Sequence, residues 1–237
     1  MTPDLQRKID TIINRNPQAD DREIIFRLKR LLYEIESQDC ADKETKHIAD
    51  LVTESLHAID EEVAQNAVIK TGFDDFDIQI GGFRLSELVI IGGRPAMGKT
   101  QLLVNLSLNI SATIPVLYIT LDLSEFLLTS RFISSVSGVP ANDILQNILS
   151  EEQKNRLSSI SDEFTKRQLF IHDGGNNSIA ALRAYCQKQA YDSGIQVIII
   201  DYLQLMTSHK HRNNRELEVS YISRELKNMA KENNICI

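Results

Sequence analysis

Long apolar runs are absent from the 237-residue sequence, in which no stretch approaches the roughly 20 consecutive apolar residues of a membrane-spanning helix. Met1 is followed by polar and charged residues and not by the apolar core of a secretory signal. We therefore expect a cytoplasmic protein without membrane contact. The 42% hydrophobic content suits one sizeable α/β domain with an appendage.

Cysteine is also scarce. The three cysteines, Cys40, Cys186 and Cys236, are odd in number, lie in unrelated contexts and form no C-x-x-C pair. This pattern predicts reduced thiols and argues against a zinc site.

Basic residues are outnumbered: 26 Lys and Arg stand against 33 Asp and Glu, which gives a net charge of −7. Such a balance argues against a generally basic surface that coats nucleic acid. It does not exclude one basic loop or pore, so any contact with DNA must be local.

Residues 88–101 read LVIIGGRPAMGKTQ and carry the motif around which the chain is organised. An apolar run predicts a strand, Gly93, Gly98, Lys99 and Thr100 fall at the spacing G-x-x-x-x-G-K-T, and a helix-like run follows. The glycines let backbone N–H groups turn around nucleotide phosphates, and the amino end of the helix adds partial positive charge. The residues predicted to bind ATP are Gly93, Arg94, Pro95, Ala96, Met97, Gly98, Lys99, Thr100 and Gln101.

Two side chains of this motif have separate predicted roles. Lys99, a predicted catalytic residue, reaches the β and γ phosphates, and Thr100 places its hydroxyl on a Mg²⁺ ion that bridges phosphate oxygens. The alternative is a glycine-rich turn without catalytic meaning. The predicted strand before the loop and the helix after it favour the nucleotide site.

Residues 1–66 predict a small helical N-terminal region that ends in a linker helix, because apolar residues recur there at helical spacing. One helix carries a stripe of Ile24, Ile25, Leu28, Leu31, Leu32 and Ile35. The linker helix carries a stripe of Ile48, Leu51, Val52, Leu56, Ile59 and Val63. The stripes need partners, which could be one another, the following domain or a neighbouring subunit.

Residues 67–237 predict an α/β domain. Its predicted strands alternate with helices and lie at 88–91, 116–121, 168–172, 196–200 and, as the opening of a fifth strand, 235–237. This alternation predicts a mainly parallel sheet whose ligands bind at the carboxyl edge of the strands.

Acidic residues stand at two points of this domain. The predicted turn at 71–82 contains Asp74, Asp75 and Asp77, for which we favour caps of a solvated turn over metal ligands. Asp201 ends a buried strand at the carboxyl edge of the sheet, where a carboxylate suits the binding of Mg²⁺. The alternative role for Asp201 is a strand-end cap.

The segment VIIIDYLQLM at 197–206, together with GGRPAMGKT and TGFDDFD, resembles the motor domain of DnaB-type replicative helicases, which are RecA-like ATPases. The resemblance covers about residues 69–237 and extends to Arg94, Pro95, Arg131 and the segment SYISRELKNMAKENN. It implies a RecA-like P-loop core and an ATP-driven DNA helicase that works in replication. It also implies a ring-shaped homo-hexamer on single-stranded DNA, with other replication proteins as partners.

The amino-terminal and carboxyl-terminal parts of the sequence differ in how they match this family. Residues before about Asp42 do not resemble the usual amino-terminal domain, whereas a linker helix that docks on the adjacent subunit would give the stripe at 48–63 a partner. Family members carry a glutamine and an arginine finger beyond the fifth strand. This sequence ends before either position, so the resemblance implies a truncated motor domain.

The family typically has Ser-Leu-Glu-Met at the end of the second strand, where this chain has Thr120, Leu121, Asp122 and Leu123. The resemblance gives Asp122 the catalytic role of placing and activating the attacking water. Aspartate is one methylene shorter than glutamate, and a displacement of about 1 Å can cost about a hundredfold in rate. We therefore expect Asp122 to be a weakened base.

The loop HKHRNNR lies where the family has its central DNA-binding loop, so the resemblance implies that Lys210, Arg212 and Arg215 contact single-stranded DNA. The alternative is an ordinary solvated loop. Two functions follow from the whole sequence: an ATP-dependent helicase motor, or a nucleotide-responsive assembly or regulatory ATPase with weak turnover.

Overall fold

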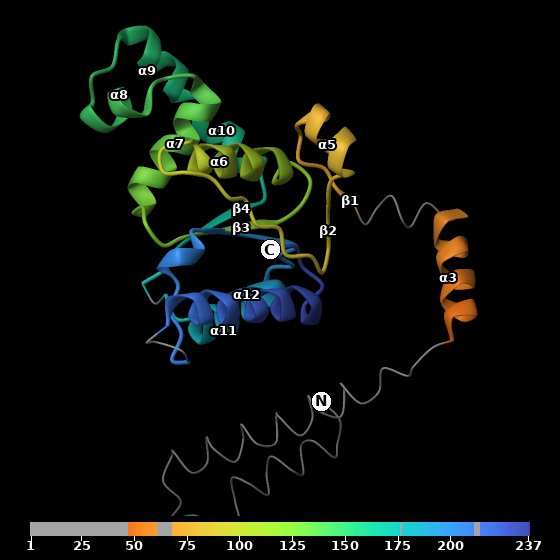
Figure 1. Ribbon diagram of the computed structural model, residues 1–237. Coiled ribbons are helices and arrows are strands. Elements are labelled where there is room, and N and C mark those ends of the chain that lie inside the picture. Colours follow the sequence, from red (N-terminus) through yellow and green to blue (C-terminus); the bar gives the residue numbers. More distant parts are fainter. Residues whose placement is uncertain (1–46, 61–67, 176, 211–213) are drawn as a thin grey trace, which may run out of the picture. The chain divides into compact units, whose positions relative to one another are not determined.

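The structure is a computed structural model that describes residues 47–60, 68–175, 177–210 and 214–237 (Figure 1). The chain divides into two units between residues 61 and 62, and each is described by itself. In the first unit, α3 (Ile48–Asp60) confirms a helix at the predicted linker, and Ile48, Leu51, Val52 and Leu56 are exposed on it. The other predicted N-terminal helices, Cys40 and Val63 lie outside the described residues.

Three parallel strands form the centre of the second unit: β3 (Val116–Thr120), β4 (Leu169–Asp173) and β5 (Val197–Asp201). Their order is β4-β3-β5, and Val116 is opposite both Leu169 and Val197. β3 is buried along its whole length, and β5 is a run of β-branched residues before Asp201. Such strands are typical of a parallel sheet covered on both faces. The predicted α/β fold class is confirmed.

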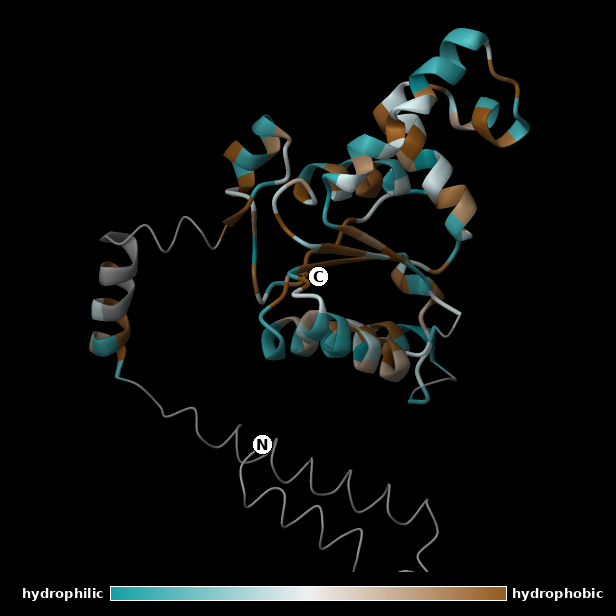
Figure 2. Ribbon diagram, turned by 180° about the vertical axis from the view of Figure 1, so that it is seen from behind, coloured by the Kyte–Doolittle hydropathy of each residue, from teal (hydrophilic) through white to brown (hydrophobic). Residues whose placement is uncertain are grey.

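Helices cover both faces of this sheet (Figure 1). One face carries α6 (Lys99–Ile110) and α7 (Glu125–Ser137), and the other carries α11 (Ile179–Asp192) and α12 (Arg215–Glu232). Alternate residues of β3 pack into two hydrophobic cores. Tyr118 belongs to the core with α6 and α7, and Leu117 belongs to the core with α11 and α12. The hydropathy colouring shows the apolar strands between the helical layers (Figure 2).

Short helices join α7 to β4, as predicted for residues 141–166. They are α8 (Ala141–Gln146), α9 (Glu151–Ser158) and α10 (Ile160–Thr165). Ser150 and Gln153 form a reciprocal capping box that fixes the start of α9. Within the described ranges, no helix combines the length and the apolar character that crossing a bilayer requires.

The segment at 235–237 lies beside β5 in parallel, as predicted for a fifth strand. Cys236 N–H donates to the Gln196 carbonyl and Ile198 N–H donates to the Cys236 carbonyl, both at 2.8 Å. On its other side, Val89 N–H donates to the Ile237 carbonyl at 2.8 Å. Ser86 N–H also donates to the Ile235 carbonyl at 3.0 Å, and Ile237 N–H donates to the Glu87 carbonyl at 2.9 Å. The segment predicted as a strand at 88–91 does not form a regular strand.

The segment at 71–82 differs from the predicted turn, because residues 74–80 form the helix α5 (Asp74–Ile80). It lies between β1 (Val68–Ile69) and β2 (Phe83–Arg84), which pair antiparallel. The Asp77 carboxylate accepts hydrogen bonds from Thr71 N–H at 3.0 Å, Thr71 Oγ1 at 2.8 Å and Gly72 N–H at 3.2 Å. Asp77 therefore caps the turn before the helix, which agrees with the predicted capping role.

Two cysteine thiols lie in the core and are unpaired, which confirms the prediction for Cys186 and Cys236. Burial raises the pKa of each thiol to about 12. Both stay protonated near neutral pH and behave as small apolar side chains.

Asp77→Asn is expected to lower the free energy of unfolding at pH 7 by about 1–2 kcal/mol, because an amide oxygen replaces a charged acceptor of three donors. Burial opposes the charge, but the bonds from Thr71 and Gly72 and the nearby Lys70 lower the pKa of Asp77 overall. Because folding lowers the pKa of Asp77, its ionised carboxylate stabilises the fold at pH values above the unfolded-state pKa of about 3.9. This stabilisation is lost as the pH falls through the folded-state pKa.

Urea unfolding at several pH values measures this effect. The difference between wild type and Asp77→Asn should be full at pH 7 and shrink below about pH 4. Asp75→Asn, which changes an exposed acid on the same helix, should have little effect. A difference that grows on acidification would contradict the capping role.

Candidate functional site

The loop between residues 92 and 98 turns the chain from the extended segment into α6. Gly98 has φ of 81° and Ala96 has φ of 59°, both in the left-handed region, and α6 begins at Lys99. Glycine adopts this conformation without steric cost, which explains Gly98 at the junction. The exposed loop therefore presents the amino end of a 12-residue helix, where free N–H groups and the helix dipole favour an anion.

The Lys99 side chain folds back over this loop. Its Nζ donates to the Gly93 carbonyl at 3.0 Å and to the Arg94 carbonyl at 2.9 Å. These acceptors are neutral, whereas a phosphate oxygen is charged and forms a stronger bond with an ammonium group. Lys99 is thus held within the loop by bonds that an anionic ligand could replace.

Asp201 lies at the carboxyl end of β5 and is 5% exposed. Its Oδ2 accepts a hydrogen bond from the Tyr118 hydroxyl at 3.0 Å. Burial, and to a lesser extent the Asp201 charge, raises the pKa of Tyr118 far above its ordinary value. The hydroxyl therefore keeps its proton and acts as the donor.

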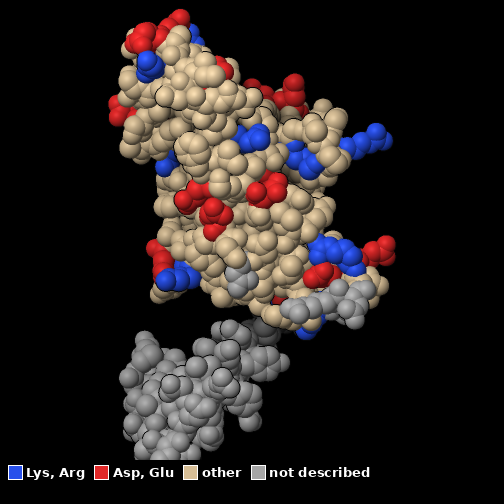
Figure 3. Space-filling model, turned by 90° about the vertical axis from the view of Figure 1, so that its left-hand side faces the viewer, with Lys and Arg blue, Asp and Glu red and all other residues tan. Residues whose placement is uncertain are grey.

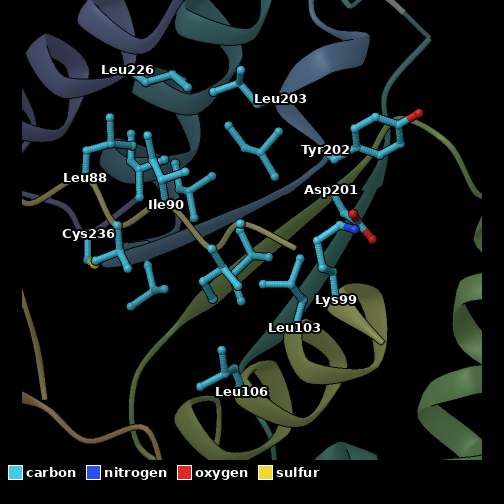
Figure 4. Close-up of a pocket in the computed structure, with 18 of the residues that line it drawn as sticks. Leu88, Ile90, Lys99, Leu103, Leu106, Asp201, Tyr202, Leu203, Leu226 and Cys236 are labelled. Atoms are coloured by element: carbon cyan, nitrogen blue, oxygen red, sulfur yellow. The ribbon is translucent and has the colours of Figure 1, made fainter. Parts of the chain in front are cut away.

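A cavity of about 310 Å³ lies between residues 88–93, β5 and α12 (Figure 4). Its walls are mostly apolar, and Lys99 and Asp201 are the charged residues among the described residues that line it. Figure 4 shows these two side chains at the same end of the cavity. That end suits a phosphate and a cation, and the apolar remainder does not.

Asp122 follows β3 at the same edge of the sheet. The β3–β5 register places Thr120 opposite Asp201. Thr120 Oγ1 donates to the Leu123 carbonyl at 2.7 Å and accepts from Leu123 N–H at 3.0 Å. This closed turn leaves Asp122 exposed, at the end of the strand beside that of Asp201.

The remaining residues predicted for this site lie along the loop and the first turn of α6. Thr100 is half-buried there, and Gln101 Nε2 donates to Ser135 Oγ of α7 at 2.7 Å. Arg94, Pro95 and Met97 are exposed on the loop. The sheet edge thus brings the loop, Asp122 and Asp201 into one region.

The base of the predicted DNA loop is held by Arg215. Its guanidinium donates to Glu218 Oε2 at 2.5 Å, to the Gln204 carbonyl at 2.6 Å and to the Met206 carbonyl at 3.3 Å. Glu218 in turn accepts from Ser208 N–H at 2.8 Å. These contacts give Arg215 a structural role, and its contact with DNA stays a prediction.

Lys210 is exposed beside this base, with Nζ 4.8 Å from the centre of the Tyr221 ring. Arg212 lies outside the described residues. On the face that Figure 3 shows, Lys and Arg side chains are scattered among Asp and Glu and do not merge into a broad basic patch. A local contact with DNA stays a prediction.

Sequence reasoning missed Tyr118 as a neighbour of Asp201. The available signal was a tyrosine within the otherwise apolar stretch at 116–119, since a buried tyrosine hydroxyl needs a hydrogen-bond partner. Which polar group it meets depends on strand pairing, which the sequence did not specify.

Residues 68–237 match the protein family described as "DnaB-like helicase C terminal domain". The chain belongs to this family. Its curated relatives include the replicative DNA helicase DnaB of Rickettsia conorii, 31% identical over an alignment that covers 96% of this chain and 49% of that protein. The replicative DNA helicase DnaB of a Nostoc species is 34% identical over 78% of this chain and 22% of that protein. The chain thus spans about half the length of the Rickettsia relative.

Solved structures agree with this membership of the DnaB-like family. A solved ATPase domain superposes with a TM-score of 0.68 at 26% identity, over 78% of this chain and 68% of that one. A DnaB-like replicative helicase, described with its interactions with primase, gives 0.67 at 25% identity, over 98% of this chain and 56% of that one. The predicted RecA-like fold and family resemblance are confirmed.

Lys99→Ala is expected to weaken the binding of ATP roughly 10- to 100-fold, the effect of losing charged hydrogen bonds of about 1.5–3 kcal/mol. Calorimetric titration with ATP and Mg²⁺ measures it. Lys227→Ala is the matched control, because Lys227 Nζ also donates to a backbone carbonyl, that of Ser86, but on α12. Equal affinity in wild type and Lys99→Ala would remove Lys99 from the site.

Proposed function

We propose that this chain is the motor part of an ATP-dependent DNA helicase, which hydrolyses ATP to move on single-stranded DNA and unwind duplex DNA during replication. The observation that carries the proposal is the placement of Lys99 and Asp201 at one end of the same cavity in a member of the DnaB-like family. A cytoplasmic location is part of the proposal.

The loop would hold the ATP phosphates through its N–H groups and the amino end of α6. Lys99 would exchange the Gly93 and Arg94 carbonyls for oxygens of the β and γ phosphates, because charged acceptors bind ammonium more strongly than neutral ones. ATP would therefore meet a loop already folded into a phosphate-binding shape.

The residues present fit Mg²⁺. Thr100 offers a hydroxyl oxygen and Asp201 a carboxylate oxygen, which are hard ligands that this ion prefers. Mg²⁺ commonly takes one or two protein carboxylates together with phosphates and waters, and the described residues contain no cluster of three or more His, Cys, Asp or Glu suited to a metal. When bound, the ion would neutralise charge on the phosphate oxygens.

Asp122 would place and deprotonate the attacking water from the end of β3. The turn closed by Thr120 and Leu123 fixes the backbone on either side of this carboxylate. Lys210, Arg212 and Arg215 would contact phosphates of single-stranded DNA, and Arg215 would also hold the base of the loop. Such contacts require charge and not base recognition.

We further propose that the chain acts within a homo-hexamer and with other replication proteins. Ile48, Leu51, Val52 and Leu56 form an exposed apolar row on α3, which suits packing against another subunit. One solved relative is described with its interactions with primase, and a partner of that kind is part of the proposal.

A second candidate function is a nucleotide-responsive assembly or regulatory ATPase with weak turnover. The observation that favours it is Asp122, which is shorter than glutamate and exposed. Nucleotide binding would be common to both functions. The rate of hydrolysis separates them.

Asp122→Glu is expected to raise DNA-stimulated ATP turnover about 10-fold or more, and Asp122→Asn to lower it, because a 1 Å change in the placed acid alters the transition state. The affinity for ATP should change little in either variant. Steady-state turnover with and without single-stranded DNA, and affinity measured separately, test this. Glu125→Gln, an exposed acid at the start of α7, is the control. Unchanged turnover in both Asp122 variants would remove Asp122 from the reaction.

A further inference from the structure

A buried tyrosine hydroxyl contacts the carboxylate proposed to bind Mg²⁺. Tyr118 is 0% exposed, and its Oη donates to Asp201 Oδ2 at 3.0 Å. The two residues come from neighbouring strands and are 83 positions apart in the sequence. The contact therefore exists only because β3 and β5 pair.

The tyrosine ring has little freedom. In the β3–β5 register, Tyr118 is opposite Ile199, two positions before Asp201, so its side chain must reach along the sheet toward the carboxyl edge. Phe132 of α7 packs edge-on against the ring, with centroids 5.8 Å apart and an interplanar angle of 85°. The hydroxyl is consequently a donor at a fixed point.

A carboxylate has two oxygens, and the hydroxyl engages one of them. The bond to Oδ2 restricts rotation of the Asp201 carboxylate, and Oδ1 remains as its second oxygen. Groups that hydrogen-bond to a metal-binding side chain commonly fix its orientation and tune its affinity for the metal. A free carboxylate would instead lose orientational freedom when the metal bound.

We propose that Tyr118 is a positioning residue that orients Asp201 for the Mg²⁺ ion of the bound nucleotide. The inference rests on the proposed metal role of Asp201. Tyr118 itself does not touch the nucleotide or the ion. Its effect should appear in the coupling between Mg²⁺ and ATP, and not in the affinity for ATP alone.

The test compares ATP affinity in Mg²⁺ and in EDTA by calorimetry, on the whole chain. The ratio of the two affinities is the enhancement by Mg²⁺. Tyr118→Phe, which removes only the hydroxyl, should reduce this enhancement roughly 10-fold and leave the affinity in EDTA unchanged. Electron paramagnetic resonance with Mn²⁺ and ATP should show the same weakening as more free Mn²⁺.

Leu128→Ala is the packing control. Leu128 is 0% exposed in the same core cluster as Tyr118, so its truncation lowers the melting temperature and should leave the enhancement by Mg²⁺ unchanged. A Tyr118→Phe variant that loses melting temperature and keeps the full enhancement would overturn the proposal, since the hydroxyl would then serve stability alone.

Asp201→Asn separates this inference from the proposed function. If Asp201→Asn reduces the enhancement and Tyr118→Phe does not, the positioning role is wrong and the metal role of Asp201 stands. If neither variant reduces it, the metal role fails and the inference fails with it. A reduction in both variants supports both.

Discussion

Parallel pairing of β3 with β5 is the constraint on which the site depends. It places Thr120 opposite Asp201, so the turn that carries Asp122 and the carboxylate of Asp201 end at one edge of the sheet. It also brings the Tyr118 hydroxyl to Asp201. Because both strands are almost wholly apolar and are covered by helices on both faces, the pairing is held by two cores at once. The polar side chains of the site therefore lie at the ends of the strands.

The loop before α6 lies at the same edge of the sheet and positions Lys99 there. Its glycine at 98 permits the left-handed turn from which the helix starts, and its own carbonyls hold Lys99. The ammonium group is therefore satisfied before any ligand arrives, by acceptors weaker than phosphate. The loop before α6, the segment of β3 that carries Tyr118 and leads to Asp122, and the end of β5 with Asp201 are three separate segments of the chain, and only the sheet brings them together.

The sequence predicted those features that depend on local pattern. β-Branched runs predicted β5, the spacing from Gly93 to Thr100 predicted the loop and the start of α6, and the apolar stripe predicted α3. It missed α5 because three aspartates in seven residues indicate a turn, and a helix forms there with Asp77 capping the turn before it. The contact between Tyr118 and Asp201 could not be predicted, since it depends on which strands pair.

The most direct test of the central claim is a crystal structure of the chain with Mg²⁺ and a non-hydrolysable ATP analogue. Lys99 Nζ is expected to leave the Gly93 and Arg94 carbonyls and to lie within hydrogen-bond distance of the β and γ phosphate oxygens. Asp201 should face the ion while it keeps the Tyr118 hydroxyl. A bound analogue with Lys99 still on the two carbonyls, and with the phosphates away from the loop, would contradict the proposed site.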